Sequence, residues 1–187
     1  MSEYGDYRDP VWTQKYIEIR RPKMEKHYVF FWHEYEEYGY LSNWYPCKFV
    51  VDDFEYLFVE QYMMAQKAKL FHDAQTYTAI LRASDPKACK DLGRLVKGFD
   101  SDVWDKVCYD VVKAGNRAKF AQNKALRDAL LATGDAILAE AAPNDKKWGI
   151  GMTAEAAEKT PQADWNGKNL LGKVLMELRE EFRRGEA

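Results

Sequence analysis

The sequence predicts a mainly α-helical domain of the α+β class, a single compact helical domain with a small β-sheet from the N-terminal strands. Apolar residues recur at helical spacing through most of the chain after residue 60, whereas short aromatic and β-branched runs gather before it. The chain has 187 residues and is 47% hydrophobic, which suits one domain with a real core. We expect residues 1–27 to form a polar, basic N-terminal extension and residues 28–187 to form the domain.

The early part of the domain has the composition of short strands. Residues 28–32 read as a buried strand, and residues 39–44 as a loop or a short strand. Residues 47–51 and 54–58 flank Asp52-Asp53, which predicts a hairpin because aspartate tolerates the left-handed backbone region better than most residues. A late strand at 136–140 is expected to complete one small sheet.

Start and stop signals divide the rest of the chain into helices. A helix is expected from Glu60 to about His72, and Asp73 is expected to cap the next one. Asp85-Pro86 combines a cap with proline at the first helical position. The predicted helices are 60–72, 74–82, 86–92, a long one capped by Ser101, one from Asn123 to Gly134, and a last one carrying Leu171, Val174, Leu175, Leu178 and Phe182 on one face, after a glycine-bearing loop to about residue 168.

Composition excludes several classes of protein. The net charge of −2 lacks the footprint of a general duplex-binding protein, although a local basic pocket for a phosphate remains compatible with it. No run of about 18 apolar residues exists, so no membrane contact is expected. Three cysteines stand far apart without C-x-x-C spacing, which favours reduced thiols and a cytoplasmic location. Cys89 and Cys108 fall on apolar helical positions, where packing is their expected role.

Motifs for metals and cofactors are incomplete. Three scattered histidines do not suggest a zinc site, and His33-Glu34, which lacks a second histidine, reads as a surface pair. Gly149-Ile150-Gly151 is half of a dinucleotide fingerprint with no third glycine. We therefore predict neither a metal nor an organic cofactor.

The most informative single residue is Glu60, a carboxylate in a run that is otherwise apolar, aromatic or amide. A charge there needs a partner, or its pKa rises because the ionised form is poorly solvated. A perturbed carboxyl group beside aromatic rings suits chemistry on a ring or a sugar. The alternative is a helix-start glutamate that only interacts with free amide groups.

Eight segments in order carry a resemblance to one family. They are Leu41-Ser-Asn-Trp-Tyr-Pro46, Glu60-Gln-Tyr-Met-Met-Ala-Gln-Lys-Ala68, Leu92-Gly-Arg94, Trp104-Asp105, Ala118-Lys-Phe-x-Gln-Asn123, Leu130-Leu-Ala-Thr-Gly134, Asn144-Asp-x-x-Trp-Gly-Ile-Gly151 and Trp165-x-Gly-x-Asn-x-Leu-Gly-x-x-Leu-Met176. Over residues 28–183 the chain resembles the YbiA-like, or NADAR (NAD- and ADP-ribose-associated), family. It departs from the family pattern at Asp53, where glycine is usual, and at Met64.

The resemblance implies a mostly helical fold and chemistry at a C1'–N bond of a phosphorylated ribose. Some members of the family are N-glycosidases that act on early riboflavin-pathway intermediates, and others remove ADP-ribose from modified guanine bases. The implied catalytic residues are Glu60, Trp104 and Asp145. The implied ligand-binding residues are Asn43, Lys67, Arg94, Lys119, Trp148, Gly149, Gly151 and Asn169.

The expected roles follow from an oxocarbenium-like transition state. Glu60 would stabilise positive charge at C1' and activate a water, by analogy with O-glycosidases. Asp145 would stabilise the leaving nitrogen or hold a ribose hydroxyl, and Trp104 or Trp148 would stack on the base. The alternatives are core packing for each indole and a solvated helix face for each of the cations Lys67, Arg94 and Lys119.

Three functions remain open at this stage. The first is an N-glycosidase acting on a small ribosyl phosphate. The second is an ADP-ribosyl hydrolase, for which nucleic acid would be a partner only as an ADP-ribosylated substrate. The third is a module that binds ADP-ribose or NAD without hydrolysing it, which would not need a carboxylate at the reacting carbon. The sequence does not indicate the oligomeric state.

Overall fold

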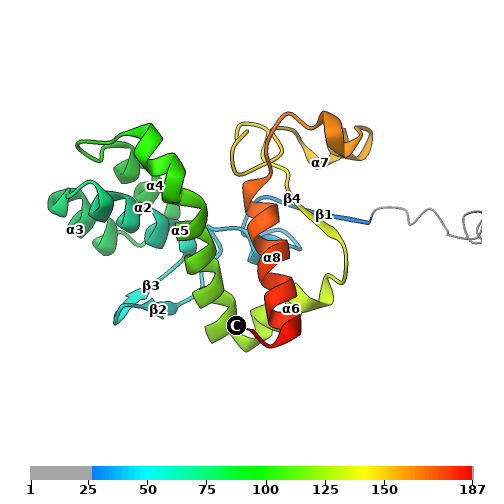
Figure 1. Cartoon of the computed structure of the whole chain (residues 1–187), viewed down its shortest axis with the longest axis horizontal. Coiled ribbons are helices and arrows are strands. Elements are labelled where there is room, and N and C mark those ends of the chain that lie inside the picture. The colour runs from blue at the N-terminus through cyan, green and yellow to red at the C-terminus, as the bar shows by residue number, and fades with distance from the viewer. Residues whose placement is uncertain (1–26, 187) are drawn as a thin grey trace, which may run out of the picture.

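The computed structural model describes residues 27–186, so the expected extension lies outside the described residues except for His27. Helices dominate the described part, and the mainly helical α+β class is confirmed (Figure 1). The elements in chain order are β1 Tyr28–Phe31, η1 Gly39–Leu41, β2 Phe49–Val51, β3 Phe54–Tyr56, α2 Val59–Leu70, α3 Ala74–Arg82, α4 Pro86–Arg94, α5 Ser101–Gln122, α6 Lys124–Ala132, β4 Ile137–Glu140, α7 Ala154–Glu158, η2 Gln162–Asp164 and α8 Leu170–Arg184.

The long helix α5 is the centre of the fold. In Figure 1 it runs between a group formed by α2, α3 and α4 on one side and α8 on the other. Its N-cap is Asp100 rather than the expected Ser101, because the Asp100 carboxylate accepts from the backbone N–H groups of Asp102 and Val103 at 2.8 and 3.2 Å. The other two aspartate caps, Asp73 and Asp85, are confirmed.

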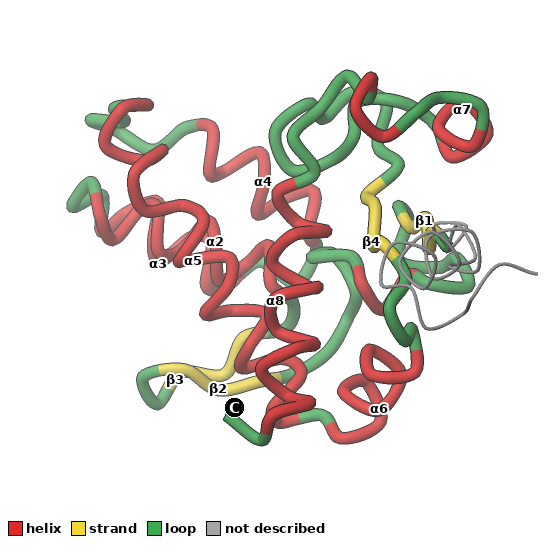
Figure 2. Tube along the Cα trace, turned by 45° about the vertical axis from the view of Figure 1, so that its right-hand side comes forward, coloured by secondary structure: helices red, strands yellow, loops and turns green. Residues whose placement is uncertain are grey.

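The strands form two separate pairs instead of the one expected sheet, as Figure 2 shows. β1 pairs in parallel with β4, from Tyr28 opposite Ile137 to Phe31 opposite Glu140, and β2 pairs with β3 in the predicted hairpin. The outer edge of β2 needs no further strand, because the Gln122 side chain of α5 exchanges two hydrogen bonds of 2.8 Å with the Val50 backbone.

The hairpin turn matches its prediction in detail. Asp52 and Asp53 both have positive φ, 51° and 62°. Two successive left-handed residues are what a two-residue hairpin loop requires, so Asp53 fills a position where glycine would be easier.

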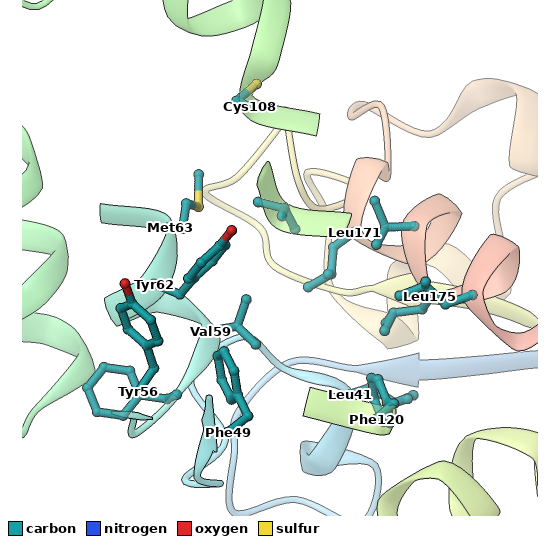
Figure 3. Close-up of a cluster of buried hydrophobic side chains, with 14 of the residues drawn as sticks. Leu41, Phe49, Tyr56, Val59, Tyr62, Met63, Cys108, Phe120, Leu171 and Leu175 are labelled. Atoms are coloured by element: carbon teal, nitrogen blue, oxygen red, sulfur yellow. The ribbon is translucent and has the colours of Figure 1, made fainter. Parts of the chain in front are cut away.

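One buried cluster joins the hairpin, α2, α5 and α8 (Figure 3). Tyr62 of α2 packs against α5 at Gly115, where an added Cβ would lie 2.7 Å from the Tyr62 ring, and Leu171 and Leu175 enter the cluster from α8. Cys89 and Cys108 are both buried and free, as expected for packing residues. Within residues 27–186, no helix is both long enough and apolar enough to cross a bilayer.

The segment after β4 is more ordered than the predicted loop. It contains the short helix α7 and the 3₁₀ turn η2, and a second small core forms around Ala139, Ile150 and Ala157. This core fixes the polar loop 141–151 against the end of β4.

Candidate active site

A polar cleft lies between the α2–α4 side of the molecule and the end of the β1–β4 pair. It has two adjoining lobes with cavity volumes of about 190 and 310 Å³, which we call the Glu60 lobe and the Trp32 lobe. The Glu60 lobe is lined by Asn43, Trp44, Glu60, Met63, Met64, Lys67, Lys90, Gly93, Arg94, Glu140, Asp145 and Trp148. The Trp32 lobe is lined by Trp32, His33, Glu34, Ser42, Trp44, Lys90, Arg94, Glu140, Ala142, Asn144 and Asp145. Five residues border both lobes, so a ligand in one lobe can extend into the other.

Glu60 is positioned by the first turn of α2. Its backbone N–H donates to the carbonyl of Asn43 at 3.0 Å, which ties the start of the helix to the loop before the hairpin. The next residue, Gln61, accepts from the Leu57 N–H at 2.9 Å and donates to the Ala83 carbonyl at 3.0 Å. A buried amide therefore fixes the helix start on which the catalytic candidate lies.

The Glu60 side chain is only 6% exposed, and burial raises its pKa to about 7. The positive charge of Lys90, a hydrogen bond with the Trp44 side chain and the charge of Arg94 favour the ionised form, while the charge of Asp145 opposes it. The carboxyl group can therefore exchange a proton close to neutral pH, which is the property required of a group that takes a proton from water.

Asp145 borders both lobes from the loop after β4. Its Oδ1 accepts from the backbone N–H groups of Lys147 and Trp148 at 2.9 and 2.8 Å, so the side chain also holds the turn that brings Trp148 to the Glu60 lobe. The structure thus brings Glu60, Asp145 and Trp148 together in one cleft.

Gly149 and Gly151 belong to this loop but not to the cleft lining. A Cβ on Gly149 would lie 2.9 Å from the carbonyl oxygens of both Glu140 and Asp145, and Gly151 has φ +67°. Both glycines let the loop fold closely onto itself and onto the end of β4. Their close contacts are made to the protein itself, so the structure does not bring either glycine, which the resemblance implied to be ligand-binding, to the cleft.

Three cations line the Glu60 lobe. Lys67 donates to the Gly93 carbonyl at 2.8 Å and lies 3.8 Å above the Phe99 ring, and burial lowers its pKa. Arg94 pairs with Asp91 at 2.9 Å and is exposed. Lys90, which sequence reasoning missed, lies 5.6 Å from the Trp44 ring and borders both lobes. These cations form the phosphate-compatible side of the cleft.

Asn43 and Lys119 have different positions. Asn43 lines the Glu60 lobe, and its side-chain oxygen accepts from Asn116 of α5 at 2.9 Å. Lys119 is fully buried, donates to the Ser42 carbonyl at 2.9 Å and does not line the cleft. Burial lowers its pKa to about 7. It anchors the loop that presents Asn43 and Trp44, instead of reaching a phosphate directly.

Trp104 and Asn169 are also absent from the cleft lining. Trp104 is 6% exposed and lines a separate hollow with Leu70 and Val107. Asn169 is buried, and its side chain accepts from the Glu140 N–H at 3.1 Å and donates to the Leu138 carbonyl at 2.8 Å. This geometry supports packing for Trp104 and alignment of β4 for Asn169.

Sequence reasoning missed several residues of the cleft. Glu140 borders both lobes, and His33 and Glu34, expected as a surface pair, line the Trp32 lobe. The signal for Glu140 was available, since this charged residue ends an otherwise apolar strand and precedes the Asn144–Gly151 motif. Within residues 27–186, no group of three histidine, cysteine or carboxylate side chains has the arrangement of a metal site.

Over residues 27–186 the fold and the cleft define an α+β domain whose site combines the buried Glu60, further carboxyl groups and cations, a class of site that many hydrolases use. The profile of the NADAR domain matches residues 30–183, and the chain belongs to the NADAR domain family.

Three similar proteins illustrate the relationship. An N-glycosidase of Acanthamoeba polyphaga mimivirus is 48% identical over 145 residues, which are 75% of this chain and 85% of that protein. A riboflavin biosynthesis protein of Vibrio vulnificus is 34% identical over 155 residues, 83% of this chain but 38% of that longer protein. The NMR structure of the Escherichia coli protein YbiA superposes with a TM-score of 0.72 at 32% identity, covering 87% of this chain and 89% of that one.

Proposed function

We propose that this protein hydrolyses the C1'–N bond of a phosphorylated ribosylamine, such as an early intermediate of riboflavin synthesis. The observation that carries the proposal is the buried Glu60 carboxyl group, which shares one cleft with Asp145 and three cations. Breaking an N-glycosidic bond builds positive charge on the sugar, and a buried, pre-positioned carboxylate stabilises that charge far better than water does.

Different groups of the Glu60 lobe would act on the reacting carbon and on the phosphate of such a substrate. Glu60 faces C1', stabilises the oxocarbenium-like transition state and accepts a proton from the attacking water. Lys67, Lys90 and Arg94 supply positive charge for the 5'-phosphate. Trp148 and Asn43 supply an aromatic face and an amide at the wall of the same lobe.

The relatives support the reaction class. The chain is an enzyme, a hydrolase of N-glycosyl bonds, since its mimivirus relative and the YbiA protein of Shigella boydii, 34% identical over 159 residues, are both named N-glycosidases. The relative named for riboflavin biosynthesis supports the particular substrate proposed.

A specific feature of the cleft favours a second candidate, hydrolysis of ADP-ribose from a modified guanine base. The Trp32 lobe adds about 310 Å³ next to the Glu60 lobe, and the Trp32 and His33 rings stack at 4.0 Å beside it. A second planar group and a diphosphate therefore have a place to bind. Nucleic acid would then be a partner only through the modified base.

The deciding experiment offers both substrates to the same enzyme preparation. A ribosylaminopyrimidine 5'-phosphate and an ADP-ribosylated guanine nucleotide are incubated separately, and release of ribose 5-phosphate or of ADP-ribose is measured by mass spectrometry. We expect turnover of the ribosylamine phosphate. Release of ADP-ribose alone would assign the second function, and binding without turnover of either compound would refute hydrolysis.

A further inference from the structure

Glu140 is the last residue of β4 and faces both lobes of the cleft. Its Oε2 atom is buried, and no hydrogen-bond partner lies near it in the described part of the chain. Buried polar atoms are nearly always paired, so an unpaired carboxyl oxygen that borders a ligand cleft calls for a functional explanation.

The backbone around Glu140 is held from three directions. Its N–H donates to the Asn169 side chain at 3.1 Å, and its carbonyl accepts from the N–H groups of Ala142 and Ile150 at 2.9 and 2.8 Å. It also pairs with Phe31 across the parallel strands. The carboxyl group therefore projects from a rigid frame, as a group that acts on a bound substrate should.

The charged groups around Glu140 come from every side of the cleft. Glu60 lies on α2, Lys90 and Arg94 lie on α4, and His33 and Glu34 follow β1, while Asp145 belongs to the next loop. Burial, and after it the negative charges of Asp145 and Glu60, together raise the pKa of Glu140 to about 8, while the positive charge of Lys90 opposes them. This carboxyl group is therefore largely protonated at neutral pH and has a proton to donate there, beside Glu60, whose pKa burial raises to about 7.

We propose that Glu140 is the general acid of the reaction, the group that protonates the leaving nitrogen while Glu60 acts at C1'. The inference rests on the proposed function. As the C1'–N bond breaks, its electron pair stays with nitrogen, which takes the Glu140 proton and leaves as the free amine. Water forms the new C1'–O bond and gives a proton to Glu60, and a proton transfer through solvent restores both carboxyl groups.

The test uses two substrates that differ in their need for an acid. The first is a ribosylaminopyrimidine 5'-phosphate, whose nitrogen must be protonated. The second is 4-nitrophenyl riboside 5-phosphate, whose phenolate leaves without a proton. Glu140→Gln should slow the first by at least about a hundredfold and the second by less than about threefold. The Tm of Glu140→Gln checks that the variant is folded, and Glu60→Gln serves as the comparison that slows both substrates.

The pH profile of the unmodified enzyme tests the role of Glu140 without a variant. For the ribosylamine, kcat/KM should rise as Glu60 ionises near pH 7 and fall as Glu140 ionises near pH 8, and for the nitrophenyl compound the fall should be absent. An equal loss on both substrates in Glu140→Gln, or the same alkaline fall for both, would overturn the role of Glu140 and leave the proposed function standing. Failure of the unmodified enzyme to hydrolyse the ribosylamine would overturn the proposed function and the role of Glu140 together.

Discussion

Burying an ionised carboxyl group at the wall of a cleft costs desolvation free energy, and several neighbours of Glu60 offset part of that cost. Lys90, Arg94 and the Trp44 side chain stabilise its ionised form, and burial and Asp145 oppose them. The balance leaves a pKa of about 7, the point at which a carboxylate is both present and basic enough to accept a proton.

Glu60→Gln should retain the fold and lose turnover, because the shape is kept while the negative charge at C1' is removed. We expect kcat to fall by at least about a hundredfold, about 3 kcal/mol of transition-state stabilisation. Steady-state kinetics and a melting curve on the same sample provide the measurement, with the exposed Glu158→Gln as the matched control. A folded Glu60→Gln enzyme with a near-normal rate would remove Glu60 from the mechanism.

Trp104→Phe should act on stability rather than on catalysis. The indole is 6% exposed and packs outside the cleft, so its shortening leaves a partly filled hollow between α2 and α5. We expect a loss of about 1–3 kcal/mol in the free energy of unfolding and an unchanged rate per folded molecule. Denaturant titration and activity on one preparation measure both, with the exposed neighbour Val103→Ala as control. A lower rate at unchanged stability would restore the stacking role.

At this scale the sequence was most informative where a residue conflicted with its neighbours. Glu60 stood out as a charge in an apolar run, and Asp145 and Trp148 stood out in a short polar motif. Lys119 and Asn169 were placed at the ligand by family resemblance, whereas the structure uses them to hold backbone carbonyls near the cleft. A single sequence does not indicate whether a buried polar residue binds a ligand or holds a backbone carbonyl, because both roles need the same side chain.

At the scale of elements, the site depends on how closely α8 packs against β4. A Cβ on Gly172 would lie 2.1 Å from the Leu138 carbonyl and 2.5 Å from the Asn169 side chain. The helix can approach the strand only because this position has no side chain. The same contact keeps Asn169 aligned with the backbone of Glu140.

Gly172→Ala should therefore destabilise the protein, since the added methyl group meets the Leu138 backbone and an Asn169 side chain that is held by its own hydrogen bonds. Overpacking of this kind costs about 1–3 kcal/mol or more. Chemical denaturation would measure the loss, and Lys173→Ala, at the exposed next position, is the control. Equal stability of the two variants would show that α8 can shift to make room.

Elements were predictable where local signals decide them. Aspartate caps set the starts of α3 and α4, and the hairpin followed from its aspartate turn. The pairing of β1 with β4 could not be predicted from the sequence, because strand pairing depends on contacts between residues far apart in the chain. The edge of the hairpin was equally hard to predict, because a helix residue, Gln122, hydrogen-bonds the outer edge of β2 with its side chain.

At the scale of the whole molecule, the candidate site is assembled from carboxyl groups and cations on several elements. We expect activity without a metal or an organic cofactor, since carboxylate chemistry can complete the hydrolysis. Exhaustive treatment with EDTA followed by dialysis should leave the rate unchanged. Loss of activity that only an added divalent ion restores would contradict this expectation, and a parallel melting curve would separate loss of a cofactor from loss of the fold.

The parallel pairing of Tyr28–Phe31 with Ile137–Glu140 also affects how the protein folds during its synthesis. The first strand leaves the ribosome long before its partner has been translated. Its aromatic and aliphatic side chains therefore have no strand partner while α2 to α6 are synthesised. Closing so large a loop is slow, and an unpaired apolar strand is a template for association with other chains. Synthesis that pauses between α6 and β4 should therefore yield more aggregate, and the cleft can form only after the loop that carries Asp145 and Trp148 has been translated.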